Sequence, residues 1–153
     1  MSKTLRLILG DQLNINHSWF QTNDNSVTYV LMEVRSETDY TTHHIQKIAG
    51  LFCAMRNFAA ELKSKKHQVI YFHLNEAANL QSFDKNIKYL IEKETFTNFE
   101  YQLPDEYRID ELLKKINQTV LISPSVFDSE HFMSSREELG DFFEKKKTFL
   151  MES

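Results

Sequence analysis

The residues best placed to bind a small molecule follow the first apolar run of the chain. Leu5 to Leu9 is apolar except for Arg6 and leads directly into Gly10, Asp11 and Gln12, which is typical of a buried strand that ends in a turn. Gly10 permits a tight turn or a close approach of another part of the chain. Asp11 either caps this turn or presents its carboxylate to a ligand, and the pattern alone leaves both possibilities open.

A second strand end carries further polar side chains. The run 27–34 is rich in β-branched and aromatic residues and includes Met32 and Glu33, and the loop after it supplies Glu37 and Tyr40. The ends of two parallel strands converge on one crevice of a sheet. Carboxylates in that crevice can accept hydrogen bonds from ring N–H groups and sugar-alcohol hydroxyls, whereas they would repel a phosphate.

Several familiar kinds of site are excluded by the residues present. The only glycines are Gly10, Gly50 and Gly140, which excludes a P-loop and the glycine-rich dinucleotide fingerprint. His43 and His44 are adjacent, so on a helix they point about 100° apart and do not form the i, i+4 pair that grips zinc. We therefore expect packing or surface roles for both histidines and predict no metal site. Neither a Ser-His-Asp signature nor a nucleophile elbow is present, so we predict no catalytic residue.

Hydrophobic periodicity predicts the elements that position these residues. We expect strands at 5–9, 27–34, 68–74, 99–103 and 120–122, and helices at 41–65, 83–94 and 105–116. A last helix should follow the capping-box sequence SSRE at 134–137, with the lysines at 145–147 on a solvated face near its end. Because strand and helix alternate, we predict an α/β fold, a doubly wound parallel five-stranded sheet with helices on both faces. Ligands bind such sheets at the carboxyl ends of the strands.

Length and composition restrict the class of protein. The 153 residues are enough for one domain, 1–153, with a substantial core. The net charge of -4 provides no broad basic field for nucleic acid, so any DNA contact must be local or come from elsewhere. The single cysteine, Cys53, fits a reducing compartment, and we interpret it as a small core residue. No apolar run approaches the roughly 20 residues of a membrane span and no secretory signal is visible, so we expect a cytoplasmic protein without membrane contact.

Four segments together resemble a known family. They are LILGDQL near the N-terminus, LMEVRSETDYTTHHIQKIAGLFCAMRNFAAELK, VIYF, and FMSSREELGDFFEKKKTFLMES. The most specific parts are the GDQL turn, the E-x(3)-E-x(2)-Y-x(2)-HH-x(3)-I pattern at 33–48 and AMR-x-F at 54–58. Over essentially its whole length the chain resembles the N-terminal domain of the deoxyribodipyrimidine photolyase-related proteins, the bacterial iron-sulfur cryptochromes and photolyases, with their Rossmann-like fold.

The resemblance implies an antenna domain. In the family a ribityl-lumazine passes its excitation to FAD in a large helical C-terminal domain, which also holds a 4Fe-4S cluster and binds damaged DNA. Carried over to matching positions, the site for 6,7-dimethyl-8-ribityllumazine would be formed by Gly10, Asp11, Gln12, Met32, Glu33, Glu37, Tyr40 and Leu51. This chain would then be a fragment of a longer lyase, and FAD and the cluster would belong to the domain it lacks. We expect no catalysis by the domain alone.

Two functions from different classes remain open at this stage. The first is the antenna domain of a light-dependent DNA-repair enzyme or photoreceptor. The second is a structural or interaction module of the same parent protein that binds no chromophore and only packs on its helical partner. The gathering of Asp11, Glu33 and Glu37 at one sheet edge favours the first, because a purely structural domain does not need it.

Overall fold

A parallel β-sheet forms the centre of the molecule. The computed structural model describes residues 2–134 and 137–144. Five strands lie in the order β3-β2-β1-β4-β5, and every pair is parallel. Their bounds are β1 (Thr4–Leu7), β2 (Val27–Met32), β3 (Gln68–Phe72), β4 (Asn98–Gln102) and β5 (Ser123–Phe127). The predicted α/β class and the five-stranded parallel sheet are confirmed.

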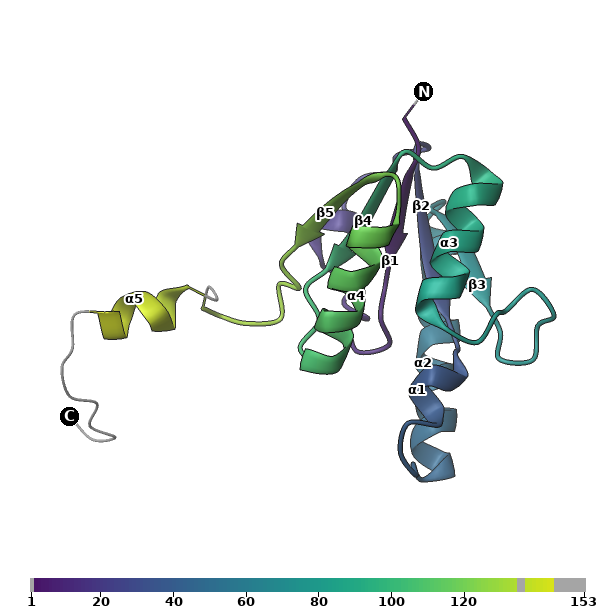
Figure 1. Ribbon diagram of the computed structural model, residues 1–153, viewed down its shortest axis with the longest axis horizontal. Helices are drawn as coiled ribbons and strands as arrows, with labels where there is room; N and C mark the ends of the chain where they lie inside the picture. The colour runs from purple at the N-terminus through teal and green to yellow at the C-terminus, as the bar shows by residue number, and fades with distance from the viewer. Residues whose placement is uncertain (1, 135–136, 145–153) are drawn as a thin grey trace.

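Helices cover both faces of this sheet. In Figure 1, α3 (Phe83–Glu94) and α4 (Tyr107–Thr119) lie in front of the strands. The other face is covered by α2 (Ile45–Ser64) and by the short 3-10 helix η1 (Ser18–Phe20), while α1 (Arg35–Thr38) follows β2. A final helix, α5 (Glu138–Glu144), lies apart from the sheet in Figure 1. No described helix is long and apolar enough to cross a membrane.

Two hydrophobic cores result, one on each face, because successive strand residues point to opposite sides. The core under α3 and α4 contains Leu7 of β1 and Leu113 of α4, both fully buried. The core under α2 contains Tyr29 and Leu31 of β2 together with Leu62 of α2. The two faces of β2 are therefore both buried, which explains why apolar side chains occupy successive positions from Tyr29 to Met32.

The order of the strands determines where a ligand can enter. From β1 the chain moves to β2 and β3 on one side, and then crosses back to β4 and β5 on the other side. The carboxyl ends of β1 and β4 therefore meet at the point where the winding direction reverses. Doubly wound sheets bind ligands in the crevice at this switch point.

The last strand and the position of Cys53 differ from the sequence-based expectations. The last strand is Ser123–Phe127 rather than 120–122, because Val120 and Ile122 pack against the core as part of the connection while β5 itself is exposed along its whole length. Pro124 is tolerated there because β5 is an edge strand. Cys53 is exposed and is not a core residue, since the buried stripe of α2 passes through Phe52 and Met55 on either side of it. The last helix begins at Glu138, directly after 134–137 as predicted, while residues 135–136 of the predicted capping box and the lysines at 145–147 lie outside the described residues.

Candidate functional site

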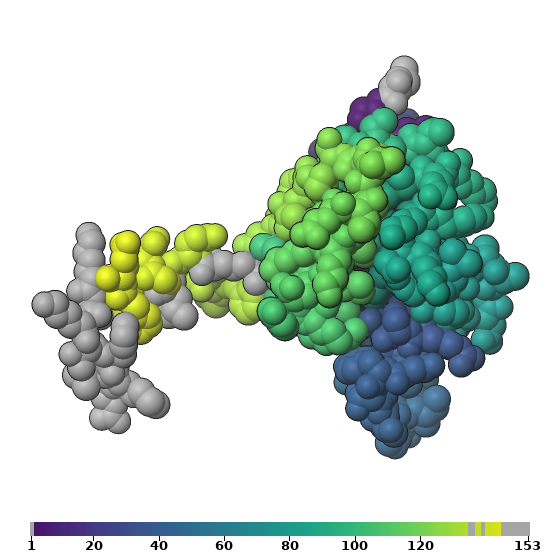
Figure 2. Space-filling view, viewed as in Figure 1, coloured from purple at the N-terminus to yellow at the C-terminus, as the bar shows by residue number. Residues whose placement is uncertain are grey.

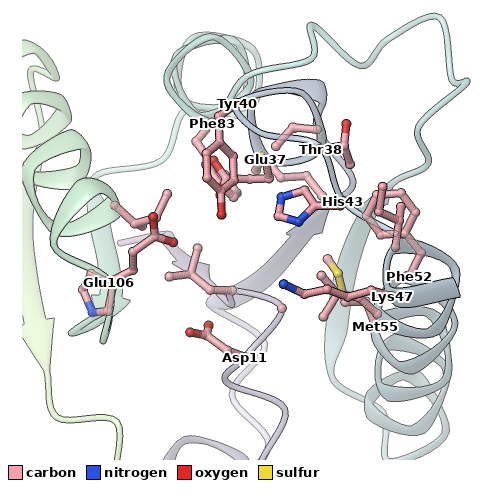
Figure 3. Close-up of a pocket in the computed structure, with 18 residues that line it drawn as sticks. Asp11, Glu37, Thr38, Tyr40, His43, Lys47, Phe52, Met55, Phe83 and Glu106 are labelled. Carbon is pink, nitrogen blue, oxygen red and sulfur yellow. The ribbon is translucent and has the colours of Figure 1, made fainter. Parts of the chain in front are cut away.

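A cavity of 290 Å³ opens at the carboxyl ends of β1, β2 and β4. Its volume is close to the lower end of the range of about 300–1,000 Å³ that is usual for small-molecule sites. Figure 3 shows side chains from several separate segments pointing into it. The lining residues are mostly apolar: Leu9, Gly10, Asp11, Met32, Val34, Glu37, Thr38, Tyr40, His43, Lys47, Ile48, Leu51, Phe52, Met55, Phe83, Pro104, Glu106 and Ile109.

Gly10 allows α2 to approach the turn after β1. A Cβ atom at this position would lie 3.1 Å from Cδ1 of Leu51 and 3.2 Å from Sδ of Met55. These distances are shorter than ordinary van der Waals contacts, so any larger residue would have to displace the two side chains. The glycine therefore favours close packing, which is one of the two roles that the sequence left open for it.

Asp11 brings a carboxyl group to the same wall and is drawn pointing into the cavity in Figure 3. Partial removal of water by the surrounding protein raises the pKa of this carboxyl, and the negative charges of Asp105 and Glu106 raise it further. A hydrogen bond from its own backbone acts in the opposite direction. The residue is nevertheless accessible to solvent. Asp11 can thus accept hydrogen bonds from a ligand, and it gives up its negative charge more readily than an ordinary aspartate.

Glu37 and Tyr40 form the opposite wall of the cavity. Arg108 of α4 lies behind this wall, outside the lining, and contacts both residues. Arg108 donates to both carboxylate oxygens of Glu37, at 3.0 and 2.7 Å, and its guanidinium carbon lies 4.1 Å from the ring centroid of Tyr40. Its Nε also donates to Glu106 at 2.8 Å. These carboxylates raise the pKa of Arg108 further above its ordinary value, so the charge of Glu37 is balanced within the protein.

Two basic side chains, of His43 and Lys47, line the cavity near the start of α2. His44 caps this helix, because its Nδ1 accepts from the backbone N–H of Gln46 at 3.2 Å. That cap fixes the start of α2, from which Lys47 lines the cavity, while His43 lines it from the position before the cap. Figure 3 shows the amino group of Lys47 directed toward the centre, across from Glu106. Within the described part of the chain Lys47 forms no ion pair, so its donors are available to a ligand.

Two of the eight residues predicted for the site lie elsewhere. Gln12 is buried, its Oε1 accepts from Leu9 N at 3.2 Å, and its Nε2 donates to the carbonyl oxygens of Gln102 and Leu103. It therefore ties the turn after β1 to the end of β4. The remaining predicted residues, Gly10, Asp11, Met32, Glu37, Tyr40 and Leu51, all line the cavity.

Glu33 is the second predicted residue that does not line the cavity. Its side chain is completely buried, and Arg56 of α2 donates to it from Nε at 2.6 Å and from Nη2 at 2.9 Å. The hydroxyl of Tyr71 and the backbone N–H of Leu74 donate to it at 2.7 and 2.8 Å. Burial acts to raise the pKa of Glu33, but these hydrogen bonds outweigh it and hold the pKa below its ordinary value. The carboxylate joins β2, β3 and α2.

Sequence reasoning missed the basic residues of the site. Lys47 carries no signal of its own, because a lysine in the first turns of a helix is most often a solvated residue. Arg108 pairs with Glu37 across 71 positions of sequence, and no local pattern reports such a contact. Phe83 and Ile48 were expected on apolar helix faces, and the structure brings both to the cavity. No group of three or more metal-binding side chains occurs among the residues that the structure describes.

Comparison with known proteins identifies the family. The family model described as deoxyribodipyrimidine photo-lyase-related protein matches residues 6–153. A protein of Agrobacterium fabrum (strain C58) named (6-4) photolyase is 33% identical over 149 residues, which are 97% of this chain. The chain spans only 29% of the length of that relative. The resemblance seen in the sequence is thereby confirmed, and the chain belongs to the deoxyribodipyrimidine photolyase-related family.

Proposed function

We propose that the cavity binds an antenna chromophore, 6,7-dimethyl-8-ribityllumazine. The observation that carries this proposal is the position of the cavity at the switch point of the sheet, with six of the eight residues carried over from the family resemblance in its lining. A site of 290 Å³ with mostly apolar walls and a few polar groups matches a flat heterocycle with a short polar chain.

The charges of the cavity support an uncharged ligand. Glu37 and Glu106 are both paired with Arg108, and the lining also contains one further carboxyl, of Asp11, and one further cation, of Lys47. Lys47 can donate to the ring carbonyl oxygens of a lumazine, and the free lone pairs of Glu37 and Asp11 can accept from ring N–H groups or ribityl hydroxyls. Leu51 and Met32 supply apolar surface for the ring.

The role in the longer protein is part of the same proposal. When bound, the lumazine would absorb near-ultraviolet light and pass its excitation to FAD in a helical C-terminal domain. That domain would also hold a 4Fe-4S cluster, because the single cysteine of this chain cannot supply the four thiolates. The name of the Agrobacterium relative, (6-4) photolyase, supports a parent protein that acts as a photolyase. We propose that this protein acts in the cytoplasm and contacts damaged DNA through the helical domain. This domain itself would perform no catalytic step.

The alternative is a structural module that packs on the helical domain without a chromophore. The two functions differ in one measurable property, saturable uptake of the lumazine by the purified chain. Fluorescence titration of residues 1–153 with 6,7-dimethyl-8-ribityllumazine should show one saturable site. Absence of uptake by a chain with an intact far-ultraviolet circular dichroism spectrum would favour the structural module.

Variants locate the binding site. Leu51→Trp places an indole against the cavity from a side chain that is 40% exposed, so the helix can accept it while the cavity loses volume. We expect affinity for the lumazine to fall by at least about tenfold, which corresponds to about 1.4 kcal/mol. Ala60→Trp adds the same group to an exposed position of α2 that does not line the cavity, and it should bind like the parent chain. Equal affinity of the two variants would remove the cavity from the proposal.

A further inference from the structure

The wall of the cavity formed by residues 35–44 is attached to α2 by the cap at its last residue, His44, and to the rest of the protein by few other contacts. On its outer side, the backbone N–H groups of Arg35 and Ser36 donate to Gln81, both at 3.3 Å. Across the cavity, every side-chain hydrogen bond and ion pair that reaches this segment from the described residues comes from Arg108. Figure 2 shows the blue surface of the α1 region meeting the green surface of α4 at the lower side of the molecule.

Arg108 is well suited to hold this wall in one position. Its guanidinium binds Glu37 with two parallel hydrogen bonds and stacks on Tyr40, and a lysine can reproduce neither geometry. Glu106 accepts from Nε of the same guanidinium at 2.8 Å, so the orientation of the side chain is set from its own helix. The contact thus joins the start of α4 to the segment after β2.

The contact lies at the mouth of the cavity. Tyr40 and Glu106 both line the cavity. Tyr40 is 52% exposed, and the side chain of Glu106 is 47% exposed. Residues that meet the solvent and the cavity at once form its rim, which also includes Asp11, Lys47 and Leu51. Arg108 bridges the part of this rim that lies between α1 and α4. A ligand that enters or leaves between α1 and α4 must therefore displace the Arg108 contacts.

We propose that Arg108 is a positioning residue of the chromophore site, which holds Glu37 and Tyr40 over the cavity mouth and so limits the rate at which the lumazine enters and leaves. This inference rests on the proposed function. If opening of the Arg108 contacts precedes both binding and release, a weaker contact accelerates both steps by a similar factor and leaves the dissociation constant nearly unchanged.

The test compares Arg108→Gln with a matched control on the same helix, Lys114→Gln. Lys114 is also a cation of α4 that pairs with two carboxylates, but its partners are Asp110 and Glu111 and none lies in residues 35–44. Stopped-flow fluorescence with 6,7-dimethyl-8-ribityllumazine should show association and dissociation both faster by on the order of tenfold in Arg108→Gln, from the loss of a bidentate pair and a cation–π contact. Arg108→Lys should give intermediate rates, and Lys114→Gln should match the parent chain.

A measurement without ligand separates the two proposals. Amide hydrogen exchange of residues 35–44 should become faster in Arg108→Gln and stay unchanged in Lys114→Gln. If the parent chain binds the lumazine but both rates and the exchange are the same in Arg108→Gln, the role of Arg108 is refuted while the antenna function stands. If Arg108→Gln only lowers affinity with an unchanged dissociation rate, Arg108 is a structural residue. If the parent chain binds no lumazine, the antenna function fails and the control of ligand exchange fails with it.

Discussion

The carboxylate of Glu33 can be neutralised with almost no change of shape by Glu33→Gln. Its Oε1 accepts from Arg56 Nε and Tyr71 Oη, and its Oε2 accepts from Arg56 Nη2 and Leu74 N. A glutamine retains one acceptor oxygen and replaces the other with a donor. All four neighbouring groups, which belong to three residues, are hydrogen-bond donors. The new NH2 group, itself a donor, must therefore face two of them.

The cost depends on which oxygen is replaced. The less costly arrangement puts the NH2 group at the Oε1 position, because the Tyr71 hydroxyl can rotate and accept, which leaves only Arg56 Nε without its partner. A charge-assisted hydrogen bond contributes about 1.5–3 kcal/mol. Breaking a fully buried ion pair would cost about 3–5 kcal/mol, but the side chain of Arg56 is 50% exposed and can reach water. We therefore expect the free energy of unfolding to fall by about 2–3 kcal/mol, which lowers Tm by roughly 5–10 °C.

Urea denaturation followed by tryptophan fluorescence measures this loss. The only tryptophan, Trp19, is 5% exposed in the core under α2, the face on which Glu33 lies, so its emission reports unfolding there. Tyr71→Phe is the graded control: it removes one of the four hydrogen bonds and should cost about 1 kcal/mol. The lumazine affinity of folded Glu33→Gln should equal that of the parent chain. A loss of stability below about 0.5 kcal/mol, or a loss of affinity without a loss of stability, would refute the structural role assigned to Glu33.

Three further perturbations test the fold around the site. Gly10→Ala should lower the free energy of unfolding by about 1 kcal/mol, at the low end for overpacking because Leu51 and Met55 are flexible, and it should weaken lumazine binding. Thermal melts and fluorescence titration measure the two effects, and an unchanged Tm would contradict the close packing. The pKa of Glu33 is held below its ordinary value of 4.5, so its contribution to stability is complete above pH 4.5 and is lost as the pH falls through the lowered pKa. Urea midpoints should therefore fall less steeply between pH 7 and pH 3 in Glu33→Gln than in the parent chain, and parallel curves would argue against this role of Glu33. Leu113→Ala truncates a fully buried side chain and should cost about 2–5 kcal/mol in the same assay, and a cost under about 1 kcal/mol would show that the core under α4 is loosely packed.

The architecture could be predicted from sequence because its signals are local. The helix at 83–94 has the predicted bounds, and the apolar runs of β1, β2 and β3 begin within a residue of their predicted starts. The edge strand β5 could not be placed, because its side chains are exposed and carry neither alternation nor a continuous apolar run. Its position is determined by pairing with β4, from Asn98 with Ser123 to Gln102 with Phe127, and such pairing leaves no trace in a single sequence.

The cavity was predictable in location but not in charge. Strand order and the carboxyl-end rule require only the sequence of alternating elements, and they indicate the turn at Gly10 and the loop at Glu37. An acidic crevice was expected there. Arg108 instead balances Glu37 and Glu106, and Lys47 adds a cation to the lining, because residues far apart in the sequence meet only after α2 and α4 have packed on opposite faces.

The separation of Met32 from Glu33 follows from strand parity, which is a property of the sequence. Val27, Tyr29 and Leu31 face α2, whereas Met32 and Val34 face the other core and the cavity. Because side chains alternate along a strand, Glu33 must share the face of Tyr29 and Leu31. A carboxylate that enters an apolar face requires a cation nearby, and the one arginine of α2 is Arg56, whose half-exposed side chain reaches Glu33. The same reasoning assigns Met32, and not Glu33, to the cavity, so we expect a substitution at Met32 to change lumazine affinity and one at Glu33 to change stability.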